Sequence, residues 1–169
     1  ISCSYLTDGR IRLIPNGSSP YSYNWSANAA TGNVDSAVAL GPGIYYATIT
    51  DGIGCIARDT VTLTAPTAVS FTTAVTNVSC FGGNNGSITA TPTGGTGPGY
   101  TYQWSNSATG STNATLVAGT YTLTLHDANS CSATGSATVN QPTQIVLQNP
   151  AIVNVRCFNG NTGSIAVSA

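Results

Sequence analysis

One stretch of the sequence occurs twice, and its repetition limits the folds that the chain can adopt. Residues 119–131 read GTYTLTLHDANSC, and residues 43–55 read GIYYATITDGIGC. In the later copy Leu123 and Leu125 alternate with threonines, and an alternation with a period of two is typical of a half-buried β-strand. Turn residues and a cysteine follow each strand. Two copies of one strand and turn indicate a chain built from repeats.

The cysteines at the start of each copy give the period of the repeat. Cys3, Cys80 and Cys157 open the segments SCSYLTDGRI, SCFGGNNGSI and RCFNGNTGSI, and 80 − 3 and 157 − 80 both give 77 residues. Pro66 and Pro142 cannot donate a sheet hydrogen bond, so each marks a domain junction. We expect repeat one, lacking its first strand, at 1–67, repeat two at 68–143, and the start of repeat three at 144–169.

The strand pattern predicts the fold class. Short alternating segments recur every eight to twelve residues or so, rich in Thr and Val and bounded by Gly and Pro turns, and none carries a helical period with caps. This pattern is typical of an all-β sandwich. We therefore expect an all-β protein of tandem immunoglobulin-like β-sandwich domains.

The composition excludes several classes of function. Only 5% of the residues are charged and the net charge is −1, so the basic surface that nucleic-acid binding requires is absent from the sequence. No apolar run approaches the roughly 20 residues that span a bilayer. Abundant hydroxyl and amide side chains, with five cysteines at repeat spacing, favour an extracellular protein in an oxidising compartment.

The cysteine spacing favours disulfides over a metal site. A zinc site needs ligands clustered two to four residues apart, whereas the two cysteines of repeat two, Cys80 and Cys131, are 51 residues apart (131 − 80). Four strands are expected between them, at 86–92, 100–106, 112–116 and 119–127. After an even number of strands the chain is back at the end of the sandwich from which it started, so the two cysteines would lie at the same end.

That strand count predicts bonds within each repeat. We expect Cys3–Cys55 and Cys80–Cys131, with Cys157 unpaired inside this chain. A fifth strand hidden in residues 105–111 would instead send Cys80 and Cys131 to opposite ends, and Cys3 would then be placed to meet Cys131 across the domain junction. Closing a loop of about 50 residues would stabilise each domain by roughly 3–4 kcal/mol.

Aromatic residues recur in register in both repeats. The segments YSYNW at 21–25 and YTYQW at 100–104 each place two tyrosines and a tryptophan on one side of a strand. They could form a sugar-stacking platform, but each sandwich also needs a large central anchor. We expect both tryptophans to point inward, and the predicted core aromatics are Tyr23, Trp25, Tyr45, Tyr102, Trp104 and Tyr121.

Few residues have side chains that could serve catalysis or bind a metal. Asp51 and Asp127 each follow the repeated strand, and each can cap the turn or ligate calcium, although calcium needs more oxygen ligands than a repeat supplies. The sequence has a single histidine, His126, and no glutamate, so no nucleophile with an adjacent base recurs. We expect no enzyme activity, no metal and no cofactor.

Together, the segments SCFGGNNGSI, YTYQW, AGTYTLTLHDANSC and NQPT resemble the SprB-type repeats of very large surface adhesins of gliding Bacteroidetes. The resemblance covers both full units and the partial third, and repeat one departs from it where SCSYLTDGRI replaces the glycine-rich form. It implies an extracellular filamentous protein, exported by the type IX route and displayed on the outer membrane.

The resemblance implies a structural function. We expect a stalk or filament segment of a long cell-surface adhesin, serving surface attachment or gliding motility. Its expected partners are neighbouring repeats of the same chain, with surface polysaccharide or other filament chains as further candidates, and with no nucleic acid and no membrane insertion. The alternatives are a glycan-binding module, which would expose an aromatic row, and a non-catalytic spacer of a secreted enzyme.

Two short motifs suggest attached sugar. Asp35-Ser36-Ala37 and Asp59-Thr60-Val61 resemble the Asp-Ser/Thr-apolar acceptor pattern of Bacteroidetes O-glycosylation, which makes Ser36 and Thr60 candidate sites. A three-residue pattern is weak in a threonine-rich chain, and an aspartate beside a hydroxyl is equally turn or strand-edge chemistry. A glycan there would add hydration and shield a sheet edge from pairing.

Overall fold

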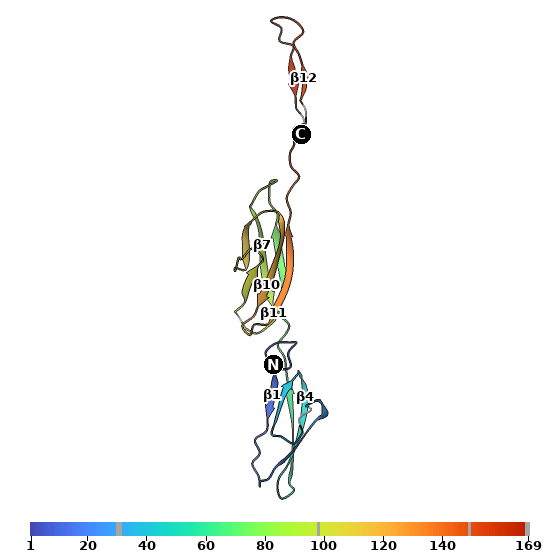
Figure 1. Cartoon of the computed structure of the whole chain (residues 1–169), viewed down its shortest axis with the longest axis vertical. Helices are drawn as coiled ribbons and strands as arrows, with labels where there is room; N and C mark the ends of the chain where they lie inside the picture. Colours follow the sequence, from blue (N-terminus) through green and yellow to red (C-terminus); the bar gives the residue numbers. More distant parts are fainter. Residues whose placement is uncertain (30–31, 98, 149, 168–169) are drawn as a thin grey trace.

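The computed structural model describes residues 1–29, 32–97, 99–148 and 150–167. In these ranges the regular structure is β-strand apart from one short 3₁₀ turn, η1 (Ala27–Ala29), so the expected all-β class is confirmed. Figure 1 shows two sandwiches and a hairpin following one another along one long axis. The first sandwich holds the strands β1 to β5, the second β6 to β11, and the hairpin β12 and β13.

Repeat two is an immunoglobulin-like sandwich of six strands. One sheet has the order β6 (Ser70–Thr76), β7 (Gly86–Thr93), β9 (Thr112–Leu116). The other has the order β11 (Ser132–Val139), β10 (Gly119–His126), β8 (Thr101–Trp104). In immunoglobulin nomenclature these are the A-B-E and G-F-C sheets, so the strand order itself identifies the fold.

The alternation read from residues 119–126 is the packing pattern of β10. Leu123 and Leu125 are 0% exposed, while Thr122 points to solvent. Side chains of successive strand residues leave opposite faces, so one face fills the space between the sheets. The main core cluster of repeat two is Val78, Ile88, Ala90, Trp104, Leu116, Leu123, Ala137 and Val139.

Repeat one has the same architecture without the strand that corresponds to β6. The strands β1 (Gly9–Arg12) and β3 (Ser36–Leu40) form one sheet. The strands β2 (Ser22–Trp25), β4 (Gly43–Thr50) and β5 (Ile56–Leu63) form the other. Its buried cluster is Ile11, Ala29, Ala37, Leu40 and Tyr45.

A hairpin resembling the start of repeat two follows at β12 (Ala151–Val153) and β13 (Ser164–Ala166). It pairs Ile152 with Ile165, as β6 pairs Val75 with Ile88 in the sheet of repeat two. Both partners are shifted by 77 positions (152 − 75 and 165 − 88). The register is therefore the same in the two hairpins.

The positions of β8 and β9 show that the expected number of passes between the two ends of the sandwich is wrong. β7 starts near Cys80 and runs to the other end of the sandwich, and β9 pairs with it in the antiparallel direction. β10 runs toward Cys131, and β8 pairs with it in the antiparallel direction. β9 pairs only with the first half of β7, and β8 only with the last half of β10. The chain thus crosses from one sheet to the other in mid-sandwich. β8 and β9 together make a single traverse, and the total is odd.

Buried glycines at the start of β1 and β7 allow the strands to approach closely. A Cβ on Gly86 would lie 2.7 Å from Val139 Cγ1 and 2.9 Å from the Leu116 carbonyl oxygen. A Cβ on Gly9 would lie 2.6 Å from the Leu40 carbonyl oxygen in repeat one. Any larger residue would have to push these strands apart, which explains a glycine at the same place in both repeats.

Candidate functional site at the junction between repeats

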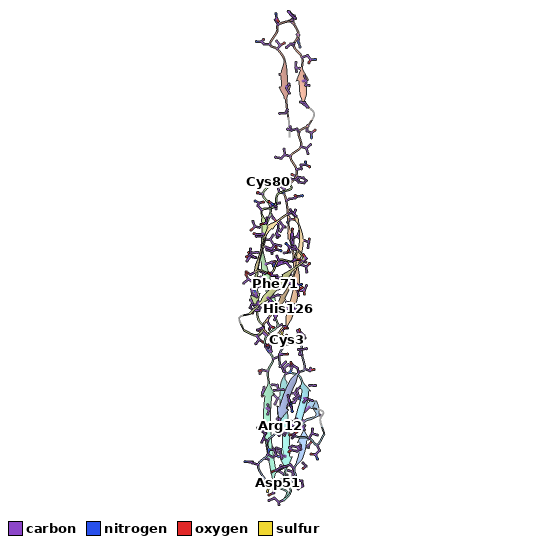
Figure 2. The ribbon with its side chains drawn as sticks, turned by 60° about the vertical axis from the view of Figure 1, so that its left-hand side comes forward. Cys3, Arg12, Asp51, Phe71, Cys80 and His126 are labelled. Carbon is purple, nitrogen blue, oxygen red and sulfur yellow. A yellow bond between two sulfur atoms is a disulfide. The ribbon has the colours of Figure 1, made fainter. Side chains whose placement is uncertain are left out.

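The disulfide of the structure joins the two sandwiches. Cys3, from the segment before β1, bonds to Cys131, from the turn between β10 and β11, with their Cα atoms 5.6 Å apart. The expected pairs Cys3–Cys55 and Cys80–Cys131 are therefore wrong, and the alternative across the junction is the one observed. The reason is the odd number of traverses, which leaves Cys80 and Cys131 at opposite ends of repeat two. Figure 2 shows Cys80 and Cys3 at these two ends.

Polar contacts reinforce the junction beside the disulfide. Asn129 Nδ2 donates to the Ser2 carbonyl oxygen at 3.2 Å and contacts Thr96 Oγ1 at 3.2 Å. The amide of Gly95 donates to the carbonyl of Thr67, in the segment that links the sandwiches, at 2.9 Å. The disulfide, an inter-repeat hydrogen bond and a fixed linker therefore meet at one place.

Asp127 shapes the turn that carries Cys131. Its Oδ1 accepts hydrogen bonds from the amides of Asn129 at 2.9 Å and Cys131 at 2.8 Å, and its Oδ2 accepts one from Thr96 at 2.8 Å. Burial of the carboxyl raises its pKa, but the backbone donors favour the charged form more strongly, so the pKa of Asp127 lies below its ordinary value. The carboxylate fixes the backbone of Cys131 directly.

Asp51 makes the same turn in repeat one. Its Oδ1 accepts from the amides of Cys55 at 2.8 Å and Ile53 at 3.1 Å. The hydrogen bond from Cys55, followed by those of its neighbours, holds the pKa of Asp51 below its ordinary value. Both aspartates therefore use their oxygens as turn caps. In the part of the chain that the structure describes, no cluster of three or more His, Cys or acidic residues is assembled that could hold a metal.

The remaining cysteines, Cys55, Cys80 and Cys157, are free and exposed among the described residues. Cys55 lies in the turn after β4, beside the Asp51 label at the far end of repeat one in Figure 2. Cys80 lies at the opposite end of repeat two from the disulfide. Each complete repeat thus carries one cysteine at each end.

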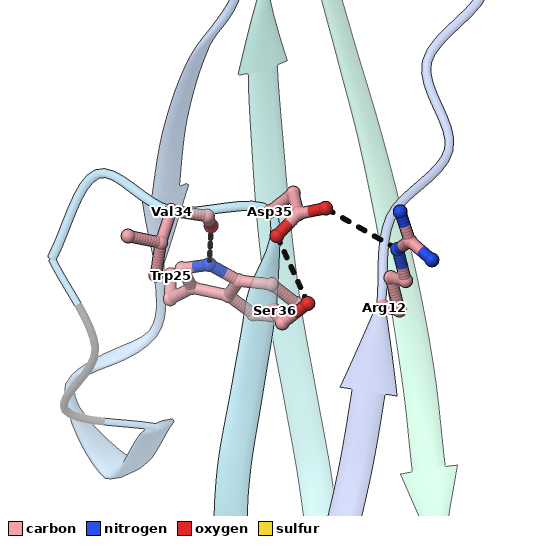
Figure 3. Close-up of polar contacts among 5 residues, drawn as sticks. All are labelled: Arg12, Trp25, Val34, Asp35 and Ser36. Carbon is pink, nitrogen blue, oxygen red and sulfur yellow. Dashed lines mark hydrogen bonds and ion pairs between the residues drawn. The ribbon is translucent and has the colours of Figure 1, made fainter.

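The aromatic side chains lie at different depths. Trp104 is 3% exposed, and its Nε1 donates to the Gly110 carbonyl at 2.9 Å. Trp25 is half-buried against the core of repeat one and donates to the Val34 carbonyl at 2.8 Å (Figure 3). Tyr102 packs half-buried on the core of repeat two, and Tyr23 is half-buried. These rings do not form an exposed row.

Two of the predicted core tyrosines also make a tyrosine corner. Tyr45 Oη donates to the Gly41 carbonyl at 2.9 Å, and Tyr121 Oη donates to the Val117 carbonyl at 3.1 Å. Both lie near the start of the F strand and reach back four residues, the arrangement of immunoglobulin-like domains. The sequence reading matched these two tyrosines to each other but assigned them only a packing role.

The two candidate glycosylation residues differ in access. Ser36 is half-buried in β3 and its Oγ donates to Asp35 Oδ1 at 2.9 Å, while Asp35 Oδ2 contacts Arg12 Nε at 3.3 Å (Figure 3). Thr60 is exposed on β5, one of the two edge strands of its sheet. Its amide donates to Asp59 Oδ1 at 2.7 Å. Only Thr60 therefore presents its side chain freely to solvent.

The main concave feature of repeat one lies where β6 lies in repeat two. It is a groove of about 490 Å³, lined by residues 12–17 and 55–59 with Tyr21, Ala47, Ile49 and Asp51. β6 pairs with residues 87–93, and the equivalent residues 77 positions earlier, 10–16, run along this groove. The groove is the uncovered edge of a sandwich, and it brings no catalytic pair together.

Residues 72–109 match the family model of the SprB repeat. This part of the chain is similar to an SprB repeat. The match begins in β6 and ends just after β8, so it covers the first half of the second sandwich. The match confirms the expected resemblance over this part of repeat two. No curated protein matches the chain in sequence, and no helix in the described residues is long and apolar enough to cross a membrane.

Solved structures that resemble the chain are tandem immunoglobulin-domain proteins. The amphioxus IgVJ-C2 molecule is 12% identical over 80% of this chain and 98% of its own, with a TM-score of 0.37. A Dscam structure is 17% identical over 81% of this chain and 42% of its own, with a TM-score of 0.38. A titin Z1Z2 tandem is 16% identical over 81% of this chain and 93% of its own, with a TM-score of 0.36. The fold assignment therefore rests on the strand order of repeat two itself.

Proposed function

We propose that this chain is a segment of the stalk of a long, secreted cell-surface adhesin, and that its role is structural and not catalytic. The single observation that carries the proposal is the Cys3–Cys131 bond, which joins consecutive sandwiches that lie end to end. An end-to-end covalent joint holds a tip at a distance from a surface. A side-by-side contact would not. The SprB repeat supports the same role.

At a finer level, we propose display on the cell surface after type IX export, for surface attachment or gliding. The support is the family match together with a disulfide, which persists in oxidising compartments. Neighbouring repeats are the proposed partners. Brief protease treatment of intact cells tests the location: the adhesin should be cleaved while cytoplasmic markers stay intact, and protection of the adhesin would contradict surface display.

Small-angle X-ray scattering on the oxidised chain tests the stalk directly. We expect the pair-distance distribution of an elongated particle with two bodies in line. The matched control is Cys3→Ser with Cys131→Ser, which removes the bond and should broaden the distribution because the junction becomes a flexible linker. A compact distribution, with the two sandwiches folded side by side, would contradict the proposal.

The second candidate function is glycan binding in the groove of repeat one, where Tyr21, Arg58 and Asp59 lie together. A binding groove needs a few convergent polar groups in an otherwise apolar hollow. We rank it below the stalk because the groove is the edge that β6 covers in repeat two. A glycan array settles the choice: binding that is lost in Arg58→Ala would favour the module, and no binding is expected for a stalk.

A further inference from the structure

We propose that Cys55, Cys80 and Cys157 are the unjoined halves of further inter-repeat disulfides, in which the first cysteine of each repeat bonds the second cysteine of the next. In the longer protein, Cys80 would pair with the second cysteine of repeat three, and Cys55 with the first cysteine of the repeat before repeat one. The inference deepens the proposed stalk function and rests on it.

The first cysteines share one backbone hydrogen bond along the chain. The carbonyl of Cys3 accepts the amide of Leu6 at 3.1 Å, that of Cys80 accepts Gly83 at 3.0 Å, and that of Cys157 accepts Gly160 at 2.9 Å. Cys3 is bonded in this turn. Cys80 and Cys157 therefore lie in turns closed by the same hydrogen bond as the turn of the bonded Cys3.

A side-chain bond upstream of each first cysteine recurs as well. The amide of Ser2 donates to Asp8 Oδ1 at 3.1 Å, and the amide of Ser79 donates to Asn85 Oδ1 at 3.1 Å. In repeat two the loop has an extra support, because Gly82 donates to Gln141 Oε1 at 2.9 Å. These hydrogen bonds hold the Cys80 loop in place although Cys80 has no disulfide partner in the described residues.

The second cysteines share their turn in the same way. Cys131 donates its amide to Asp127 Oδ1 at 2.8 Å, and Cys55 donates to Asp51 Oδ1 at 2.8 Å. The carbonyl of each cysteine accepts the amide of its aspartate at 3.0 Å. Cys55 therefore presents the geometry with which Cys131 meets Cys3.

Apolar residues flank the free cysteines and leave surface for a neighbouring repeat to cover. Phe81, next to Cys80, is 50% exposed, and Ile53, in the turn of Cys55, is 75% exposed. At the joined junction the corresponding residues are Ser4 and Asn129, and Asn129 contacts the other repeat. Cys80 lies at one outer end of the paired sandwiches and Asp51, which binds the amide of Cys55, lies at the other, where the next repeats would attach (Figure 2).

Bonds of this pattern overlap along the chain, and this changes the path that carries force. From Cys3 the force passes through the disulfide to Cys131, along the backbone to Cys157, and through the next disulfide to repeat four. The backbone part is 26 residues (157 − 131), at most about 90 Å when extended. It consists of β11, the segment that leads to β12, and β12 itself, which already run along the long axis in Figure 1. Unfolding a repeat would then add almost no length to the stalk.

The bond formation balances as a thiol–disulfide exchange. The Cys80 thiolate attacks the disulfide of an oxidant, forms a mixed disulfide and releases one thiol of that oxidant. The thiolate of the partner cysteine then attacks the Cys80 sulfur and releases the second thiol. The two cysteine thiols are oxidised, and the oxidant disulfide, a thiol oxidoreductase in the cell or oxidised glutathione in the tube, is reduced to two thiols.

A chain with repeat two duplicated tests the pairing. Residues 1–143 are followed by a second copy of 68–143, so that Cys80 of the first copy faces Cys131 of the second. Cys55→Ser, and Cys80→Ser in the second copy, leave four cysteines, and Ser132→Thr at an exposed position of the second copy gives its Cys131 peptide a distinct mass. After refolding with oxidised glutathione, non-reducing peptide mapping should recover Cys3–Cys131 of the first copy and Cys80 bonded to Cys131 of the second, with no titratable thiol.

The matched control adds Cys80→Ser in the first copy. It should keep Cys3–Cys131 and leave one titratable thiol per chain, on Cys131 of the second copy. Recovery of Cys80 as a free thiol, or of Cys80 bonded to Cys131 of its own repeat, would overturn the inference. Scattering on the same sample keeps the two proposals apart: an elongated particle with Cys80 free leaves the stalk standing and removes the overlapping bonds. A compact particle removes the stalk.

Discussion

At the scale of single residues, strand geometry and contacts between distant segments both place the side chains of repeat two. The alternation of Tyr121, Leu123 and Leu125 placed their side chains on the inward face, since side-chain direction follows from strand geometry alone. The bond from Tyr121 Oη to the Val117 carbonyl depends on the corner between two strands. Asn129 reaches Ser2, a residue of another repeat, and no local pattern encodes that contact.

The tyrosine corner should contribute measurably to stability. We expect Tyr45→Phe to lower the free energy of unfolding of repeat one by about 1 kcal/mol, because the ring stays buried while its hydrogen bond to Gly41 is lost. Denaturant titration of the purified chain measures it. Tyr46→Phe is the control, since this neighbouring ring is exposed and should change nothing. Equal effects of the two variants would contradict the corner.

The capping aspartates should make stability fall in acid. Asp127 and Asp51 have pKa values below their ordinary range when folded, so the unfolded chain binds more protons as the pH falls. Their contribution to the free energy of unfolding is fully present at pH values above 3.8, the ordinary pKa of an aspartate. It is lost as the pH falls from there through the lower pKa of the folded chain. We expect thermal melts to show a falling midpoint below that pH.

Substituting each aspartate in turn distinguishes the acid dependence of one repeat from that of the other. Asp127→Asn should weaken this acid dependence in repeat two only, and Asp51→Asn in repeat one only, because each carboxylate caps its own turn. Melts followed by the fluorescence of Trp104 and Trp25, in chains that keep one tryptophan each, report the repeats separately. An unchanged acid transition in both variants would show that other groups cause it.

At the scale of strands and sheets, the sequence predicted the class of fold but missed how two strands share one traverse. The sequence predicts strands at 100–106 and 112–116 and counts each as a full traverse of the sandwich. Their register shows that each covers half a neighbour, β8 on β10 and β9 on β7. A sheet switch in mid-sandwich depends on pairing between distant strands, and this error alone produced the wrong disulfide pairs.

The core face of β10 should dominate the stability of repeat two. Leu123→Ala removes a side chain that is fully buried between the sheets, and we expect a loss of about 2–5 kcal/mol in the free energy of unfolding. Thr122→Ala, one position away on the exposed face, should stay within about 0.5 kcal/mol of the parent. Denaturant titration compares them, and a comparable loss in both would contradict the assigned faces.

At the scale of the whole molecule, the disulfide couples the stability of neighbouring repeats. When repeat two unfolds beside a folded repeat one, the bond closes a loop from the junction near Thr67 to Cys131, 64 residues long (131 − 67). Closing such a loop costs the unfolded chain entropy and stabilises the repeat by about 4 kcal/mol. Cys3→Ser with Cys131→Ser should lower the stability of repeat two by that amount in denaturant titration, and no change would contradict the coupling.

Pulling on single molecules tests most directly whether the Cys3–Cys131 bond carries force from one repeat to the next. With handles at residues 1 and 169, force on the oxidised chain bypasses the segment between the two cysteines, which are 128 positions apart (131 − 3). The fully stretched chain should then expose little more than the 38 residues beyond Cys131 (169 − 131), a contour length of about 13 nm, as β11 and the hairpin open. The variant Cys3→Ser with Cys131→Ser should reach a contour length about 45 nm greater. An oxidised chain that extends as far as this variant would contradict the stalk described here.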